Sequence, residues 1–127
     1  MTTYMFMLFD DESWFDDVTP EKWASAMELH GNFAEAVEAA GARIVEGQAL
    51  NRTSTATLVR NDWDNLEAKP VVTDGPFIET KEALGGYYVI DCRDVDQAIE
   101  LAGICPSGTI ELRPILDTSG SGVAEGN

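Results

Sequence analysis

The stretch Thr73–Tyr88, TDGPFIETKEALGGYY, tells more about the fold of this chain than any other. It begins with charged side chains around a Gly-Pro pair and ends in an apolar segment that is typical of a strand. Asp74 at the start of a tight turn can accept hydrogen bonds from backbone amides, and proline fixes its own φ angle. Charged loops beside a buried strand often carry binding or catalytic groups. We therefore take this loop as the first candidate for a functional site.

The chain is strongly acidic. Its 127 residues include 23 acidic and 8 basic side chains, which give a formal charge of −15. Such a field repels phosphate groups, so we expect no direct contact with nucleic acid and no membrane association. No apolar run approaches the ~20 residues that span a bilayer, and the N-terminal residues lack the features of a signal peptide. We therefore expect a cytoplasmic protein.

Apolar and β-branched runs alternate with two helical patterns. Predicted strands cover residues 4–9, 43–50, 54–60, 87–92 and 109–114. A first helix is expected between a Thr19 cap and Gly41, and a second between an Asp94 cap and Pro106. We expect residues 43–50 and 54–60 to be joined by a short turn.

The order β-α-β-β-loop-β-α-β predicts an α+β fold. Without an inserted hairpin, it reduces to the two β-α-β units of a ferredoxin-like sandwich, with both helices on one sheet face. The other face is lined by either the odd-numbered or the even-numbered residues of 4–9. Both sets are too apolar for open water, so we expect a homodimer in which the sheet of another copy packs there. The predicted domain is 1–116, and the Gly/Ser-rich residues 117–127 are expected to form a flexible tail.

The sequence offers few metal ligands. Cys92 and Cys105 are its two thiols and His30 its one imidazole, too few for a structural zinc site of four Cys/His ligands. We expect both thiols to be reduced and partly buried. A disulfide between them is possible only if the fold brings the two cysteines close together. No glycine-rich phosphate loop or nucleophile elbow occurs, so we expect no cofactor and no metal.

His30 and Asp74 are the candidate catalytic residues. His30 lies in the apolar stripe of the first predicted helix, where a histidine is either a hydrogen-bonded core residue or a buried acid/base. Asp74 is either a turn residue or a carboxylate that projects into a cleft. If Asp74 reaches the His30 ring, the pair could act as general acid and base.

The remaining candidates surround the same loop. Phe77 could form an apolar wall, and Glu79 and Lys81 share a face of an extended segment, where they either pair at the surface or bind a polar ligand. Tyr87, in the following strand, is the fourth substrate-binding candidate. The structural positions of the motif are Gly75, Pro76, Gly85 and Gly86.

These residues resemble a known family. From about Tyr4 to Ile115, and most specifically over Thr73–Tyr88, the chain is similar to the DGPF group of YCII-related domains. The resemblance implies a ferredoxin-like, dimeric α/β-barrel fold and, in some members, a histidine–aspartate pair proposed to transfer protons. It also implies an association with sigma factors of the extracytoplasmic-function type rather than direct DNA contact.

Three hypotheses follow for the function. The first is a protein that binds a small polar molecule near the DGPF loop, with His30 and Asp74 as acid and base in an isomerase- or lyase-like reaction. The alternative is a non-catalytic ligand-binding or interaction dimer that acts with a sigma factor. The third is a purely structural dimer.

Overall fold

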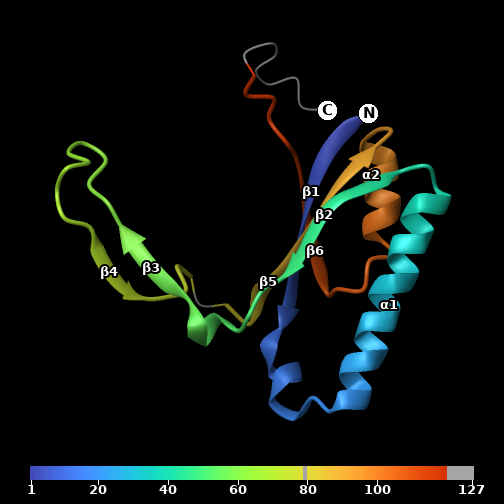
Figure 1. Ribbon diagram of the computed structural model, residues 1–127, viewed down its shortest axis with the longest axis horizontal. Helices are drawn as coiled ribbons and strands as arrows, with labels where there is room; N and C mark the ends of the chain where they lie inside the picture. Colours follow the sequence, from blue (N-terminus) through green and yellow to red (C-terminus); the bar gives the residue numbers. More distant parts are fainter. Residues whose placement is uncertain (79, 120–127) are drawn as a thin grey trace.

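Four antiparallel strands form the main sheet, in the order β2-β5-β1-β6. A computed structural model describes residues 1–78 and 80–119 of the chain (Figure 1). The strands are β1 Thr2–Asp11, β2 Arg43–Ala49, β5 Glu82–Cys92 and β6 Thr109–Pro114. One helix connects β1 to β2 and another connects β5 to β6. This arrangement confirms the predicted α+β, ferredoxin-like fold.

The two helices begin where the sequence predicts. Helix α1 (Pro20–Ala39) is capped by Thr19, whose hydroxyl accepts a hydrogen bond from the Lys22 amide at 3.1 Å. Helix α2 (Val95–Ala102) is capped by Asp94 and ends before Pro106. A short 3₁₀ helix, η1 (Glu12–Asp17), precedes α1.

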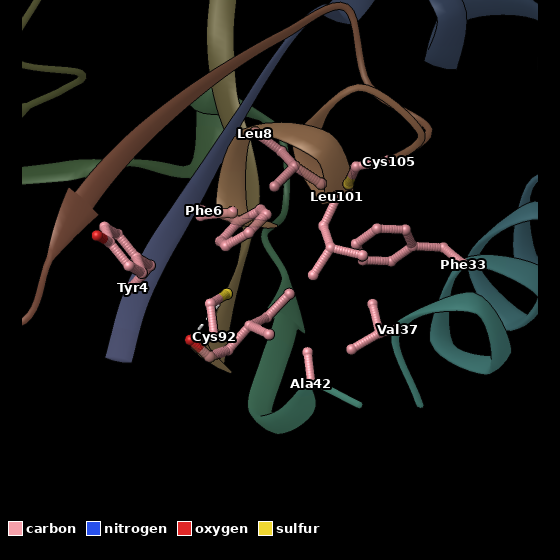
Figure 2. Close-up of a cluster of buried hydrophobic side chains, with 11 residues drawn as sticks. Tyr4, Phe6, Leu8, Phe33, Val37, Ala42, Cys92, Leu101 and Cys105 are labelled. Atoms are coloured by element: carbon pink, nitrogen blue, oxygen red, sulfur yellow. Dashed lines mark hydrogen bonds between the residues drawn. The ribbon is translucent and has the colours of Figure 1, made fainter. Parts of the chain in front are cut away.

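Alternation along β1 decides which side chains form the core. Tyr4, Phe6 and Leu8 point toward the helices, and Phe6 has no exposed surface. Figure 2 shows Phe33 and Val37 of α1 pointing into the same cluster. Both helices therefore cover one face of the sheet, as predicted. The apolar stripe of α1 is buried only in its second half, because the first half of this long helix extends beyond the core.

The opposite face of the sheet carries Met5, Met7 and Phe9, which are half-buried. Val89 lies opposite Met5, and Tyr87 lies opposite Met7. Neither helix packs on this side of the described chain (Figure 1). We call it the open face. The second sheet expected to cover it stays a prediction.

Both thiols lie on the covered side. Cys92 and Cys105 are buried and unpaired. Burial raises the pKa of Cys105 to about 12.

None of the helices in the described residues is long and apolar enough to cross a bilayer. Of the predicted tail, residues 117–119 form no helix or strand, and 120–127 lie outside the described residues.

A separate hairpin projects from the sheet. Strands β3 (Thr57–Arg60) and β4 (Val71–Asp74) pair with each other and extend away from the main sheet (Figure 1). We call residues 57–74 the arm. The inserted hairpin is thus present. Residues 43–50 and 54–60, which we expected to be two strands joined by a short turn, belong to different sheets. The 3₁₀ turn η2 (Thr53–Thr55) redirects the chain, and the β-branched residues that begin β4 supply the partner strand instead.

Two adjacent glycines in β5 have different surroundings. Gly86 is buried between two neighbouring strands, with Leu8 of β1 and Ala49 of β2 opposite it. A Cβ atom on Gly86 would lie 2.8 Å from the Gln48 carbonyl oxygen. Gly85 is the extra residue of a β-bulge, because the partners in β5 skip it between Leu8 and Phe9 of β1.

Gly86→Ala is expected to destabilise the fold by about 1–3 kcal/mol, since the new methyl group must push backbone aside. The matched control is Gly85→Ala, whose Cβ would meet nothing closer than 4.0 Å. It should change the free energy of unfolding by less than ~1 kcal/mol. Urea unfolding of both variants provides the measurement. Equal effects of the two substitutions would contradict the close backbone approach at Gly86.

Candidate functional site

Two pockets adjoin along residues 75–83, which lead from the arm back to β5. The first, the arm-base pocket, has a volume of about 340 Å³ and is lined by Thr53, Ser54, Gly75, Pro76, Ile78, Thr80 and Ala83. The second, the sheet-end pocket, has a volume of about 640 Å³ and is lined by Phe9, Asp11, Thr80, Lys81, Glu82, Thr109 and Glu111. Because Thr80 lines both, the two pockets are neighbours.

The sheet-end pocket combines one cation with three carboxylates. Lys81 is the only basic side chain among the described residues that line it, beside Asp11, Glu82 and Glu111. Both oxygens of Glu82 accept from the Thr109 hydroxyl, at 3.0 and 3.1 Å. The pKa of Asp11 is lowered chiefly by the hydrogen bond that its carboxylate accepts from the Ser13 amide. The positive charge of Lys81 lowers it to a lesser extent. The carboxylates of this pocket can therefore accept hydrogen bonds from a ligand, while Lys81 can bind one anionic group of the same ligand.

The arm-base pocket is lined by hydroxyls and a close backbone turn. Thr53 is held by Glu12, whose carboxylate accepts from the Thr53 amide at 2.7 Å and from its hydroxyl at 2.6 Å. The peptide bond between Gly75 and Pro76 is cis. A Cβ atom on Gly75 would lie 3.0 Å from the methyl group of Ala56, so glycine permits this close approach.

His30 lies on the other side of the sheet from the open face. Its Nδ1 is 2.7 Å from the hydroxyl of Tyr88, a residue that packs with the ring of Phe33 at a centroid distance of 5.2 Å. The half-buried position lowers the pKa of His30 below 6.5, because burial disfavours the charged ring, while the negative charge of Asp10 acts in the opposite direction. His30 is thus hydrogen-bonded inside the helical layer and lines neither pocket.

Asp74 lies at the end of β4, on the arm, where it is exposed. Figure 1 shows β4 and α1 on opposite sides of the molecule. A single chain therefore does not bring Asp74 and His30 together. Their joint role as acid and base stays a prediction.

The other predicted residues divide between the pockets and their surroundings. Lys81 lines the sheet-end pocket, whereas Phe77 and Tyr87 line neither. Phe77 is 68% exposed and lies under the guanidinium group of Arg60, 5.4 Å from its ring centroid. The Tyr87 hydroxyl donates to Glu46 at 2.8 Å, and this hydrogen bond raises the pKa of Tyr87.

The structural positions of the motif have separate roles. Gly75 and Pro76 line the arm-base pocket, while Gly85 and Gly86 belong to the bulge and close approach in β5. The predicted binding residue Glu79 lies outside the described residues.

Sequence reasoning missed several residues that line the pockets. The carboxylates of Asp11, Glu82 and Glu111 come from three strands, and only the pairing of those strands brings them together. A signal existed for Glu111, because alternation along residues 109–114 places it on the face opposite Ile110. No three His, Cys, Asp or Glu side chains within 1–78 and 80–119 are arranged as metal ligands.

Fold and site together define a ferredoxin-like α+β domain with a polar pocket beside a charged, glycine-containing loop. The model of the YCII-related domain family matches residues 2–119, so the chain belongs to this family and the predicted resemblance is confirmed. Its assignment to the DGPF group stays a prediction.

The chain is also similar to a protein of Rhizobium meliloti (strain 1021) that is described as "Uncharacterized protein R00369". The two are 41% identical over 68 residues, a stretch that covers 50% of this chain and 51% of the relative. The match thus spans about half the length of the relative.

The single histidine allows a direct test of its environment. Proton NMR should show one imidazole titration with a midpoint below 6.5, because burial opposes protonation. The unfolded chain takes up this proton near 6.5, but the folded chain does so only at lower pH. Wild-type protein should therefore lose stability relative to His30→Gln as the pH falls between these two values. A midpoint at or above 6.5 would contradict the buried position.

Proposed function

We propose that this protein binds a small polar organic molecule in the two adjoining pockets along residues 75–83. The observation that carries the proposal is the position of Lys81, a single ammonium group among three carboxylates in an open cavity. Converging polar groups in a concave site are the usual signature of ligand binding. Thr80, shared by both pockets, links this charged region to the hydroxyl-lined arm base.

The lining residues select a ligand chemistry. Carboxylates accept hydrogen bonds from amino or hydroxyl groups, and Lys81 can bind a carboxylate. The chain's charge of −15 favours a ligand that carries an amino group and disfavours a polyanion. We therefore propose amino acids and hydroxy acids of small size as the ligand class.

We further propose that the protein is a homodimer, with the open faces of two copies packed against each other. Met5, Met7 and Phe9 would then be covered by a second sheet. The charges support this choice of face. Helix α1 carries four glutamates and one lysine, whereas the open face carries Arg43 and Arg113 beside Glu46, Asp91 and Glu111. The strongly acidic helical layers would thus point away from each other.

The geometry supports binding ahead of catalysis. An isomerase- or lyase-like proton transfer between His30 and Asp74 requires a contact that one chain does not make, because α1 and β4, which carry these residues, lie on opposite sides of the molecule. The alternative, an interaction dimer that acts with a sigma factor, rests on the family resemblance, and no contact of the described residues bears on it.

Lys81→Met should weaken binding of the ligand by about tenfold, since a charge-assisted hydrogen bond contributes ~1.5 kcal/mol. The probe is a panel of the common amino acids and small hydroxy acids, measured by saturation-transfer NMR. Lys22→Met is the matched control, because Lys22 is an exposed lysine of α1 that lines neither pocket. His30→Gln should leave binding unchanged.

Two results would contradict this proposal. Binding of a panel member with equal affinity to wild-type protein and to Lys81→Met would exclude the sheet-end pocket as its site. If no panel member binds to the wild-type protein, the proposed ligand class is wrong.

A further inference from the structure

The arm is an isolated two-stranded hairpin. Strands β3 and β4 form a sheet of their own, and within the described residues neither pairs with a strand of the main sheet. Figure 1 shows the arm extended into solvent. A two-stranded hairpin is marginally stable by itself in water, so the arm needs a surface to pack on.

Three valines of the arm's paired strands are exposed, at positions where a solvated hairpin would carry polar side chains. Val59 and Val72 lie directly opposite each other on one arm face and are 51% and 61% exposed. On the other face, Val71 lies opposite Arg60 and is 58% exposed. Adjacent exposed β-branched residues on paired strands are typical of a surface that another sheet covers.

The base of the arm is held in place. Glu12 bonds the amide and hydroxyl of Thr53, at 2.7 and 2.6 Å. The Gly75 amide donates to the Ala56 carbonyl at 2.9 Å, directly below the paired strands. These bonds tie both ends of the arm together and to η1. The arm therefore leaves the domain in a defined direction, which lowers the entropy cost of docking.

A second copy of this chain supplies the complementary surface. Each copy carries a projecting arm with exposed valines and an open face whose apolar side chains are only half-buried in the described chain. A twofold contact satisfies both at once, because each arm reaches the partner that receives the other. Both surfaces carry charges of both signs, which a twofold partner can pair. They are Arg60, Lys69, Asp62, Asp64, Glu67 and Asp74 on the arm, and Arg43, Arg113, Glu46, Asp91 and Glu111 on the open face.

We propose that the arm docks on a second copy of the chain, beside its open face, with Val59 and Val72 at the centre of the contact. This inference rests on the homodimer of the proposed function and adds the arm to its interface. Asp74 lies two residues from Val72 and shares its arm face. Docking therefore delivers the Asp74 carboxylate to the partner rather than to the chain's own helical layer.

Val59→Asp combined with Val72→Asp should weaken the dimer by at least about a hundredfold, because it buries two charges at the contact. The matched control is Val95→Asp, the same change at a 43% exposed valine of α2, in the helical layer. Sedimentation equilibrium of the whole chain gives the dissociation constants. Circular dichroism shows that each variant is folded, and the amino-acid panel shows that the pockets are intact.

Hydrogen exchange of the wild-type chain gives a second test that needs no variant. The amides of β3 and β4 should exchange more slowly as the protein concentration rises through the monomer–dimer transition. Wild-type dimers with unchanged arm exchange, or a double variant that dimerises as tightly as Val95→Asp, would overturn arm docking and leave the homodimer standing. A wild-type chain that stays monomeric would overturn both, whereas ligand binding is decided separately by the panel.

Discussion

The register between β1 and β5 is the constraint on which the other features of this protein depend. It places Phe6 opposite Tyr88 and Met7 opposite Tyr87, so each pair belongs to one face of the sheet. A shift by one residue would exchange these faces, turning methionine toward the helices and phenylalanine toward the open side. The core, the hydrogen bond between His30 and Tyr88, and the apolar open face all follow from this one register.

The same register separates the two chemical regions of the domain. His30 and the buried thiols lie on the helix-covered side of the sheet, where burial keeps the imidazole neutral and the thiols protonated. Lys81 and its carboxylate neighbours lie where β1 ends and where β5 and β6 begin. The one histidine and the polar pockets therefore lie in different regions of a single chain.

Much of the fold could be predicted because local signals agreed with the global arrangement. Thr19 and Asp94 cap their helices as their side chains predict. The apolar residues 4–9 predicted a strand with one face under the helices and the other face on the opposite side of the sheet. The sequence left the choice of face open, because both sets of side chains are apolar. Phe33 was missed as a core residue, because the predicted apolar stripe of the first helix passed through its neighbour Ala34 instead.

The pairing of β3 with β4 could not be deduced, because the ten residues that separate them carry no short hairpin signal. The candidate site was predicted less well than the fold. Lys81, a predicted binding residue, lines a pocket, but the carboxylates around it come from three strands that meet only after folding. His30 and Asp74 were paired on chemical grounds, and neither residue's local sequence reports the distance between α1 and the arm.

The bulge at Gly85 has a consequence for how this site can vary. It makes β5 one residue longer than its partner strand just after Lys81, and bulges increase the local twist of a strand. Lys81 directly precedes Glu82, the first paired residue of β5, so three residues separate the cation from the bulge. Because side chains alternate along a strand, inserting or deleting one residue between them would turn the ammonium group to the opposite side. The length of this short segment therefore sets the side to which the cation points.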